Sequence, residues 1–91
     1  MPMDIKRMTL PRLFWDDHSE RCPPNPDAGT WHQDVKVSAR TVVVDINRKA
    51  FDNLADDADY YSGQDCPDWE DGKAIRRSAK RTAAVLRGVA W

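Results

Sequence analysis

The sequence has 91 residues, of which 41% are hydrophobic and 32% are charged, and 14 basic residues nearly balance 15 acidic ones. This length allows one domain with one modest core, and this composition excludes a chain that stays disordered. No apolar run approaches the roughly 20 residues that a helix needs to cross a membrane.

The N-terminal part of the chain predicts a single short helix. Residues 1–8 are expected to be a loose lead-in or a short edge strand, and Thr9 is then in place to cap a helix. Three apolar residues share one face of the helix that would follow: Leu10, Leu13 and Phe14. This spacing predicts a helix over about residues 10–21, with Trp15 beside the stripe at the edge of the core. An extended conformation of residues 8–15 is the alternative.

Residues 22–30 are expected to form a loop, because three prolines in four positions remove backbone donors. Apolar and β-branched residues follow with a period of two, which predicts a β-hairpin over residues 32–38 and 41–46. One long bent strand is the alternative, since the turn lacks Gly or Asn-Gly. A two-stranded sheet is marginal alone. It is therefore expected to pack on helices, or to form a homodimer through the edge of the 41–46 strand.

Residues 48–62 have the pattern of an amphipathic helix. Its apolar stripe comprises Phe51, Leu54, Ala55, Ala58 and Tyr61. Asp45 or Asn47 is suitable as its N-cap, because either side chain accepts hydrogen bonds from free backbone N–H groups, and Gly63 is suitable as its end. Three aspartates lie on one flank, which we call the acidic face: Asp52, Asp56 and Asp59.

After a polar linker over about residues 63–72, the C-terminal segment predicts a second amphipathic helix. Its apolar stripe comprises Ile75, Ala79, Thr82, Leu86 and Val89. The opposite side, which we call the basic face, comprises Lys73, Arg76, Arg77, Lys80 and Arg81. Gly88 is expected to end the helix in a left-handed conformation. The whole chain, residues 1–91, is thus expected to be a small single-domain α+β protein with the order helix, β-hairpin, helix, helix.

Charge separates sharply between these two helical segments. Residues 51–71 contain eight acids and no Lys or Arg, whereas residues 72–91 contain six bases and no acid. In one interpretation the two helices pack side by side and neutralise each other, with each exposed pair contributing only about 0–1 kcal/mol. In the other interpretation, one charged face stays free for a partner.

Three short motifs resemble a group of small uncharacterised proteins of actinobacteriophages and actinobacterial prophages. They are Phe14-Trp15-Asp16-Asp17-His18 with Arg21, then Asp57-Ala58-Asp59-Tyr60-Tyr61 after a β-rich middle, and Ser78-Ala79 in the last helix. The resemblance implies a phage or prophage protein that works in the cytoplasm of a bacterial host. That group has no assigned activity, so the resemblance implies no site residue.

Asp16, Asp17 and His18 are adjacent, and a histidine beside a carboxylate is the basic element of general acid–base catalysis. Neighbouring residues on a helix point about 100° apart, however, so Asp17 is badly placed to orient the His18 ring. No Ser or Cys nucleophile lies in a recognised motif either. We therefore expect no catalytic site, and instead expect Asp16 or Asp17 to pair with Arg12 or Arg21.

A zinc site is a weak alternative for four residues of suitable type: His18, Cys22, His32 and Cys66. Their spacing argues against it, because the C-x₂-C pairs of structural zinc sites are absent. No metal or other cofactor is therefore expected. Cys22 and Cys66 are expected to be reduced, buried or half-buried thiols, with a disulfide between them as the alternative.

Together these features predict a non-enzymatic protein that binds a host or phage protein through its charged helical faces. The alternative is a nucleic-acid-binding protein that uses the basic face, with tryptophans available to stack on bases. A pI near 6.0 and the acidic segment argue against this alternative. Membrane binding is not expected, because the basic segment lacks suitably placed flanking aromatic residues.

Overall fold

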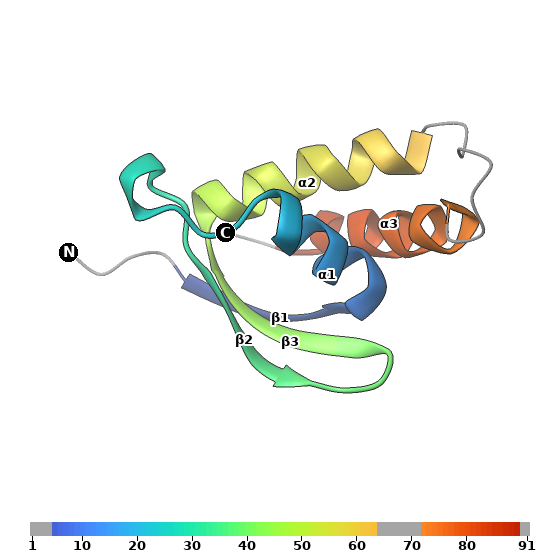
Figure 1. Cartoon of the computed structure of the whole chain (residues 1–91), viewed down its shortest axis with the longest axis horizontal. Helices are drawn as coiled ribbons and strands as arrows, with labels where there is room; N and C mark the ends of the chain where they lie inside the picture. Colours follow the sequence, from blue (N-terminus) through green and yellow to red (C-terminus); the bar gives the residue numbers. More distant parts are fainter. Residues whose placement is uncertain (1–4, 64–71, 90–91) are drawn as a thin grey trace.

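The computed structural model describes residues 5–63 and 72–89, which form a three-stranded antiparallel sheet with helices on one face (Figure 1). The elements follow one another in the order β1 (Ile5–Pro11), α1 (Arg12–Arg21), the 3₁₀ helix η1 (Pro26–Ala28), β2 (His32–Val37), β3 (Thr41–Asn47), α2 (Arg48–Gly63) and α3 (Gly72–Arg87). The small α+β fold expected from the sequence is confirmed, and the edge strand considered for residues 1–8 is present as β1, which extends to Pro11. None of the described helices is long and apolar enough to cross a membrane.

The sheet has the strand order β1–β3–β2, so β3 lies in the centre and pairs with both neighbours. The expected hairpin is confirmed as β2 and β3, with a register shift between Asp34 and Lys36 that makes Val35 a β-bulge. The strand over residues 41–46 has no free edge for the expected homodimer, because β1 pairs with the side of β3 that a hairpin alone leaves open. Within the described residues, the free edges of the sheet belong to β1 and β2.

β1 is a strand because its alternate residues match the buried side of β3. Met8 lies opposite Val44. Leu10 lies opposite Val42, and all four of these side chains are buried. The strand ends at Pro11, which an edge strand tolerates because one of its sides needs no partner.

α1 begins at Arg12, two residues later than expected, because the β1–β3 ladder extends through Pro11. The backbone N–H of Arg12 still donates to the carbonyl of Arg40 (3.1 Å). Thr9 therefore lies inside β1 and does not cap the helix. The later start also changes which residues face the core, since Leu13, expected on the apolar stripe, is 47% exposed.

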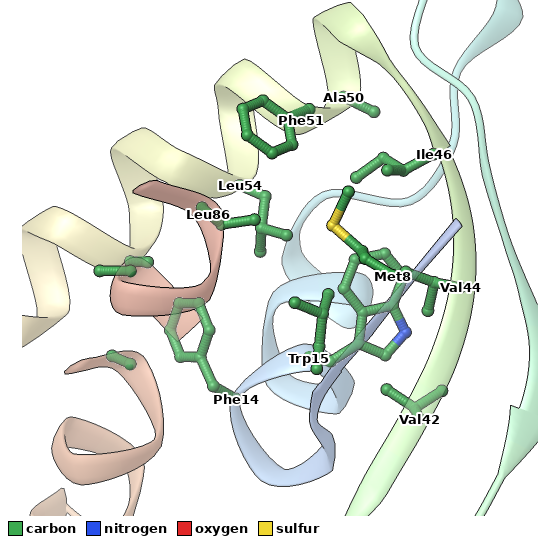
Figure 2. Packing of buried hydrophobic residues seen from close by; sticks show 14 residues of the cluster. Met8, Phe14, Trp15, Val42, Val44, Ile46, Ala50, Phe51, Leu54 and Leu86 are labelled. Atoms are coloured by element: carbon green, nitrogen blue, oxygen red, sulfur yellow. The ribbon is translucent and has the colours of Figure 1, made fainter. Parts of the chain in front are cut away.

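Trp15 lies at the centre of the core and not at its edge, because α1 packs against both the sheet and the longer helices (Figure 2). Its ring is buried beside Met8 and Val44, and its Nε1–H donates to a carboxylate oxygen of Asp34 (2.8 Å). Phe14 points the other way, toward α2 and α3. Full burial of an apolar side chain such as that of Phe14 contributes about 1.5–3 kcal/mol to the stability of the fold. The rest of the cluster comprises Leu10, Val42, Ile46, Ala50, Phe51, Leu54, Ala58, Ala79, Ala83 and Leu86.

The two long helices confirm the expected amphipathic patterns, since the apolar stripes of α2 and α3 lie in the core or pack against it. Asn47 caps α2, because its Oδ1 accepts from the backbone N–H of Ala50 (3.0 Å). Asp45, the other candidate cap, instead pairs with Arg7 on β1 (2.8 Å). α3 ends just before Gly88 as expected, although this glycine does not take the left-handed conformation.

A side chain from α3 caps the N-terminus of α1. Pro11, the residue before the helix, offers no side-chain acceptor, and the backbone N–H of Phe14 instead donates to Ser78 Oγ (2.9 Å). Both groups are buried, so this bond satisfies a helix-terminal N–H that water does not reach. Thr82 stabilises the same turn of α3 by donating its hydroxyl to the Ser78 carbonyl (2.8 Å). The first helix is thereby tied to the last.

We expect Ser78→Ala to lower the free energy of unfolding by about 1–3 kcal/mol, because it leaves the buried N–H of Phe14 without an acceptor. Unfolding in urea measures this loss. Ser62→Ala is the matched control, since the hydroxyl it removes bonds the carbonyl of Asp59 in its own helix (2.9 Å). Equal stabilities of the two variants would show that Ser78 does not hold α1 to α3.

Candidate functional site on the charged helices

α2 and α3 lie side by side and antiparallel, yet they neutralise each other very little (Figure 1). Among the described residues one ion pair joins them, between Arg87 and Asp59 (3.4 Å), and both side chains are more than half exposed. A further polar contact is a hydrogen bond from Arg76 Nε to the carbonyl of Ser62 (3.4 Å). Among the described residues the expected neutralisation thus occurs at one position only, and apolar side chains of both helices pack in the shared core.

The acidic face of α2 is exposed. Asp52 pairs with Arg48 of the same helix (3.3 Å), and both side chains remain more than half exposed. Asp56 is exposed and has no ion pair in the part of the chain that the structure describes. The three carboxylates expected from the sequence, with Asp59 as the third, therefore share one accessible surface.

The basic face of α3 is exposed as well and has fewer acidic partners. Lys73, Arg77, Lys80 and Arg81 are exposed and form no ion pair with any described residue. Together with Arg76 the first three line a shallow hollow of about 280 Å³. Like charges four residues apart on a helix repel each other by a few tenths of a kcal/mol. The stability of α3 alone therefore does not account for this arrangement.

A second hollow, of about 640 Å³, adjoins the basic face where α3 meets the start of α1 and the β2–β3 turn. Arg77 and Arg81 line it from α3, Arg12 lines it from α1, and Arg40 lines it from the turn. Figure 1 shows these three parts of the chain on the same side of the molecule. Arg12 is paired with Asp16 (3.1 Å), as expected from the sequence, whereas Arg40 has no ion pair with a described residue.

Arg12 and Arg40 were not expected on this surface. Each lies at the end of a strand, and the β1–β3 register, which places Pro11 opposite Thr41, brings them to the same end of the sheet. The sequence signal for Arg40 was weak, because it consisted of a single arginine at the predicted hairpin turn.

A second polar cluster joins α1 to α2. The Asp57 carboxylate accepts hydrogen bonds from His18 Nδ1 (2.7 Å) and from Arg21. Arg21 also pairs with Asp17, as expected, and its guanidinium lies 4.5 Å from the centre of the Tyr61 ring. Asp57 was missed because it stands among many aspartates. Its place beside the apolar stripe of α2 was the signal that distinguishes it from the others.

The surroundings of His18 favour a structural role over acid–base chemistry. Its side chain is 2% exposed and packs against the rings of Phe14 and Trp15. A general base has to come within hydrogen-bonding reach of a substrate, and a ring buried in this way offers no such approach. The pair of His18 and Asp57 therefore serves to fasten α1 to α2.

Two ionisable groups near this cluster have shifted pKa values. Burial by itself raises the pKa of Asp57, but hydrogen bonds from His18 and Arg21 and the charge of the guanidinium outweigh it, so the pKa falls below its ordinary value. The pKa of His32 is also lowered, chiefly by burial, although its hydrogen bond to the carbonyl of Cys22 (3.2 Å) acts in the opposite direction. At neutral pH, Asp57 is therefore charged and His32 is neutral.

The residues considered for zinc do not gather into a site. His18 faces Asp57, and His32 faces the carbonyl of Cys22. Over residues 5–63 and 72–89, no three His, Cys, Asp or Glu side chains come together as metal ligands. Cys66 lies outside the described residues. Cys22 has a free thiol and is exposed on the loop after α1, so the expectation of a buried or half-buried side chain is wrong for it.

No protein-family model matches the chain, and neither a curated protein nor a solved structure matches it significantly. Its function is therefore interpreted from its own geometry. That geometry consists of two exposed faces of opposite charge and a hollow lined by four arginines.

We expect Asp57→Asn to lower the free energy of unfolding at neutral pH by about 1.5–3 kcal/mol, because a neutral amide replaces the carboxylate that binds Arg21. The pKa of Asp57 is lowered in the folded protein. Its stabilising effect is therefore complete above the unfolded value of about 3.9 and is lost as the pH falls through the folded value. The difference between variant and native chain should persist at about pH 5 and shrink in more acidic solution.

Urea unfolding at a series of pH values checks this prediction. Asp56→Asn is the control, since it makes the same chemical change at an exposed neighbouring position and should alter stability by less than about 0.5 kcal/mol. Native-like stability of Asp57→Asn across the whole series would contradict the prediction.

Proposed function

We propose that this chain is a small non-enzymatic phage-type protein that binds a host or phage protein through the charged faces of α2 and α3. One observation carries the proposal: the acidic face and the basic face stay exposed on neighbouring helices, and one ion pair joins them among the described residues. Charges that the fold does not neutralise remain available to a partner. In a complex, such charges set the orientation and the rate of association.

The spacing of the acidic face suggests what kind of protein fits it. Asp52, Asp56 and Asp59 stand at intervals of four and three residues, so they follow one flank of α2 over about 10 Å. A row of carboxylates of this kind imitates a short stretch of phosphate backbone. A protein that has a basic groove for nucleic acid is therefore a suitable partner.

The phage setting, and the bacterial cytoplasm as the place of action, are supported by the motifs that resemble actinobacteriophage proteins. Residues of those motifs contact one another in the fold: His18 bonds Asp57, and the backbone of Phe14 bonds Ser78. These contacts hold the helices together. Partner binding is therefore assigned to surface charges and not to the motifs as such.

Affinity capture from a nuclease-treated lysate of a bacterial host, with the chain as bait, tests the proposal. We expect one protein to be retained in a fixed ratio to the bait and to be identified by mass spectrometry. Asp52→Lys/Asp56→Lys should lose it, because the acidic face then repels a basic groove. The matched control is Glu20→Lys/Asp27→Lys, which reverses two exposed acids outside α2 and should retain the partner.

Identical sets of captured proteins on these two double variants would contradict the proposal. Failure of the native chain to retain any protein in a fixed ratio would contradict it as well. Circular dichroism of both variants verifies that a lost partner reflects lost charge and not a lost fold.

A further inference from the structure

The surface around the 640 Å³ hollow supports an inference that goes beyond the proposed binding of a protein. We propose that the basic face of α3, together with Arg40 across the hollow, binds the phosphate backbone of double-stranded nucleic acid. Six cations of this surface form no ion pair with a described residue: Lys73, Arg76, Arg77, Lys80, Arg81 and Arg40. Asp16 is the one acid among the described lining residues, and it is already paired with Arg12 (3.1 Å).

The distribution of the described acids favours nucleic acid. The acidic segment of the sequence would repel phosphate if it lay beside the basic face. In the structure, no residue of α2 lines either hollow. Apart from Asp16, which is paired with Arg12, the charged residues that line the two hollows in the described part of the chain are all basic.

The shape of the hollow suits a phosphate backbone. Arg77 and Arg81 stand on one side of it and Arg40 on the other, while the small side chains of Ala39 and Ala74 leave space between them. Arginine guanidinium groups bind phosphate oxygens in a bidentate manner. A strand of backbone lying in the hollow is thus within reach of arginines from two sides.

Charge density favours nucleic acid over an acidic protein. The row from Lys73 to Arg81 is about 12 Å long along the helix axis. Duplex DNA carries one negative charge per about 1.7 Å of its axis and offers about seven phosphates over that length. An acidic helix with one carboxylate per turn offers about two. Over the same length, a duplex therefore offers more anions to the five cations of this row than an acidic helix with one carboxylate per turn does.

The lining also favours double over single strands. Proteins that bind single strands without sequence preference stack the bases on aromatic side chains. Within residues 5–63 and 72–89, no Phe, Tyr or Trp lines either hollow. The described lining therefore offers contacts to phosphate and no aromatic ring for an unpaired base.

Fluorescence anisotropy with a labelled random-sequence duplex of about 20 base pairs, titrated between about 50 and 200 mM salt, tests the inference. We expect a Kd of about 10⁻⁴–10⁻⁶ M near physiological salt. The slope of log K against log salt should be negative and no steeper than about −5 for six cations. Arg77→Ala/Arg81→Ala should reduce the slope by about 2.

Arg40→Ala and Lys36→Ala form a matched pair, because each removes one exposed cation from the same hairpin. The first should reduce the slope by about 1, and the second should leave it unchanged, since Lys36 does not line the hollow. The unfolding midpoint of each variant is measured as well, and a midpoint equal to that of the native chain verifies that the fold is intact.

Four outcomes would overturn the inference. They are no saturable binding at about 50 mM salt, equal effects of Arg40→Ala and Lys36→Ala, tighter binding of a single strand of the same length, and displacement of the duplex by polyglutamate as effectively as by unlabelled duplex at equal charge. The last result would assign the surface to an acidic protein. The capture experiment uses nuclease-treated lysate and variants of α2, so the two proposals can fail separately.

Discussion

The position of α1 between the sheet and the pair of long helices is the constraint on which the rest of the structure depends. Trp15 fills the side toward the sheet and Phe14 fills the side toward α2 and α3 (Figure 2). Each residue also donates a hydrogen bond. The indole N–H of Trp15 donates to Asp34, and the backbone N–H of Phe14 donates to Ser78. A buried donor without an acceptor costs about 1–3 kcal/mol. Orientations of α1 that apolar packing alone would allow are therefore less stable, because they lose these two bonds.

The same helix organises the charged surface. At its end, Arg21 and His18 converge on Asp57 and hold one aspartate of α2 on the inner side. The aspartates of the acidic face remain outside. At the start of α1, Arg12 forms an ion pair with Asp16, so this acid is not paired with the arginines of α3. The packing of α1 thereby separates charges that are paired inside the fold from charges that stay exposed.

The predictable parts of the fold are those that a local period encodes. α2, α3 and the hairpin each bury one regular face, and their bounds and apolar stripes were predictable from spacing. The same applies to the acidic and basic faces, because each belongs to one helix. At the N-terminus the local spacing predicts the wrong element, because Leu10 and Leu13 have helical spacing. Leu10 instead belongs to a strand that pairs with residues about 30 positions away. Arg40 in the hollow and the Asp57–His18 bond depend on register and packing between distant elements, which no local pattern records.

The β-bulge of β2 has a consequence for how the molecule behaves at high concentration. β2 is an edge strand that exposes Val35 and Val37, and an exposed apolar edge is a template on which other chains add strands and precipitate. The bulge at Val35 interrupts the regular alternation of the edge, and Lys36 next to it adds a charge that repels an identical strand. We therefore expect the irregularity in the hairpin to make strand addition at this edge less favourable.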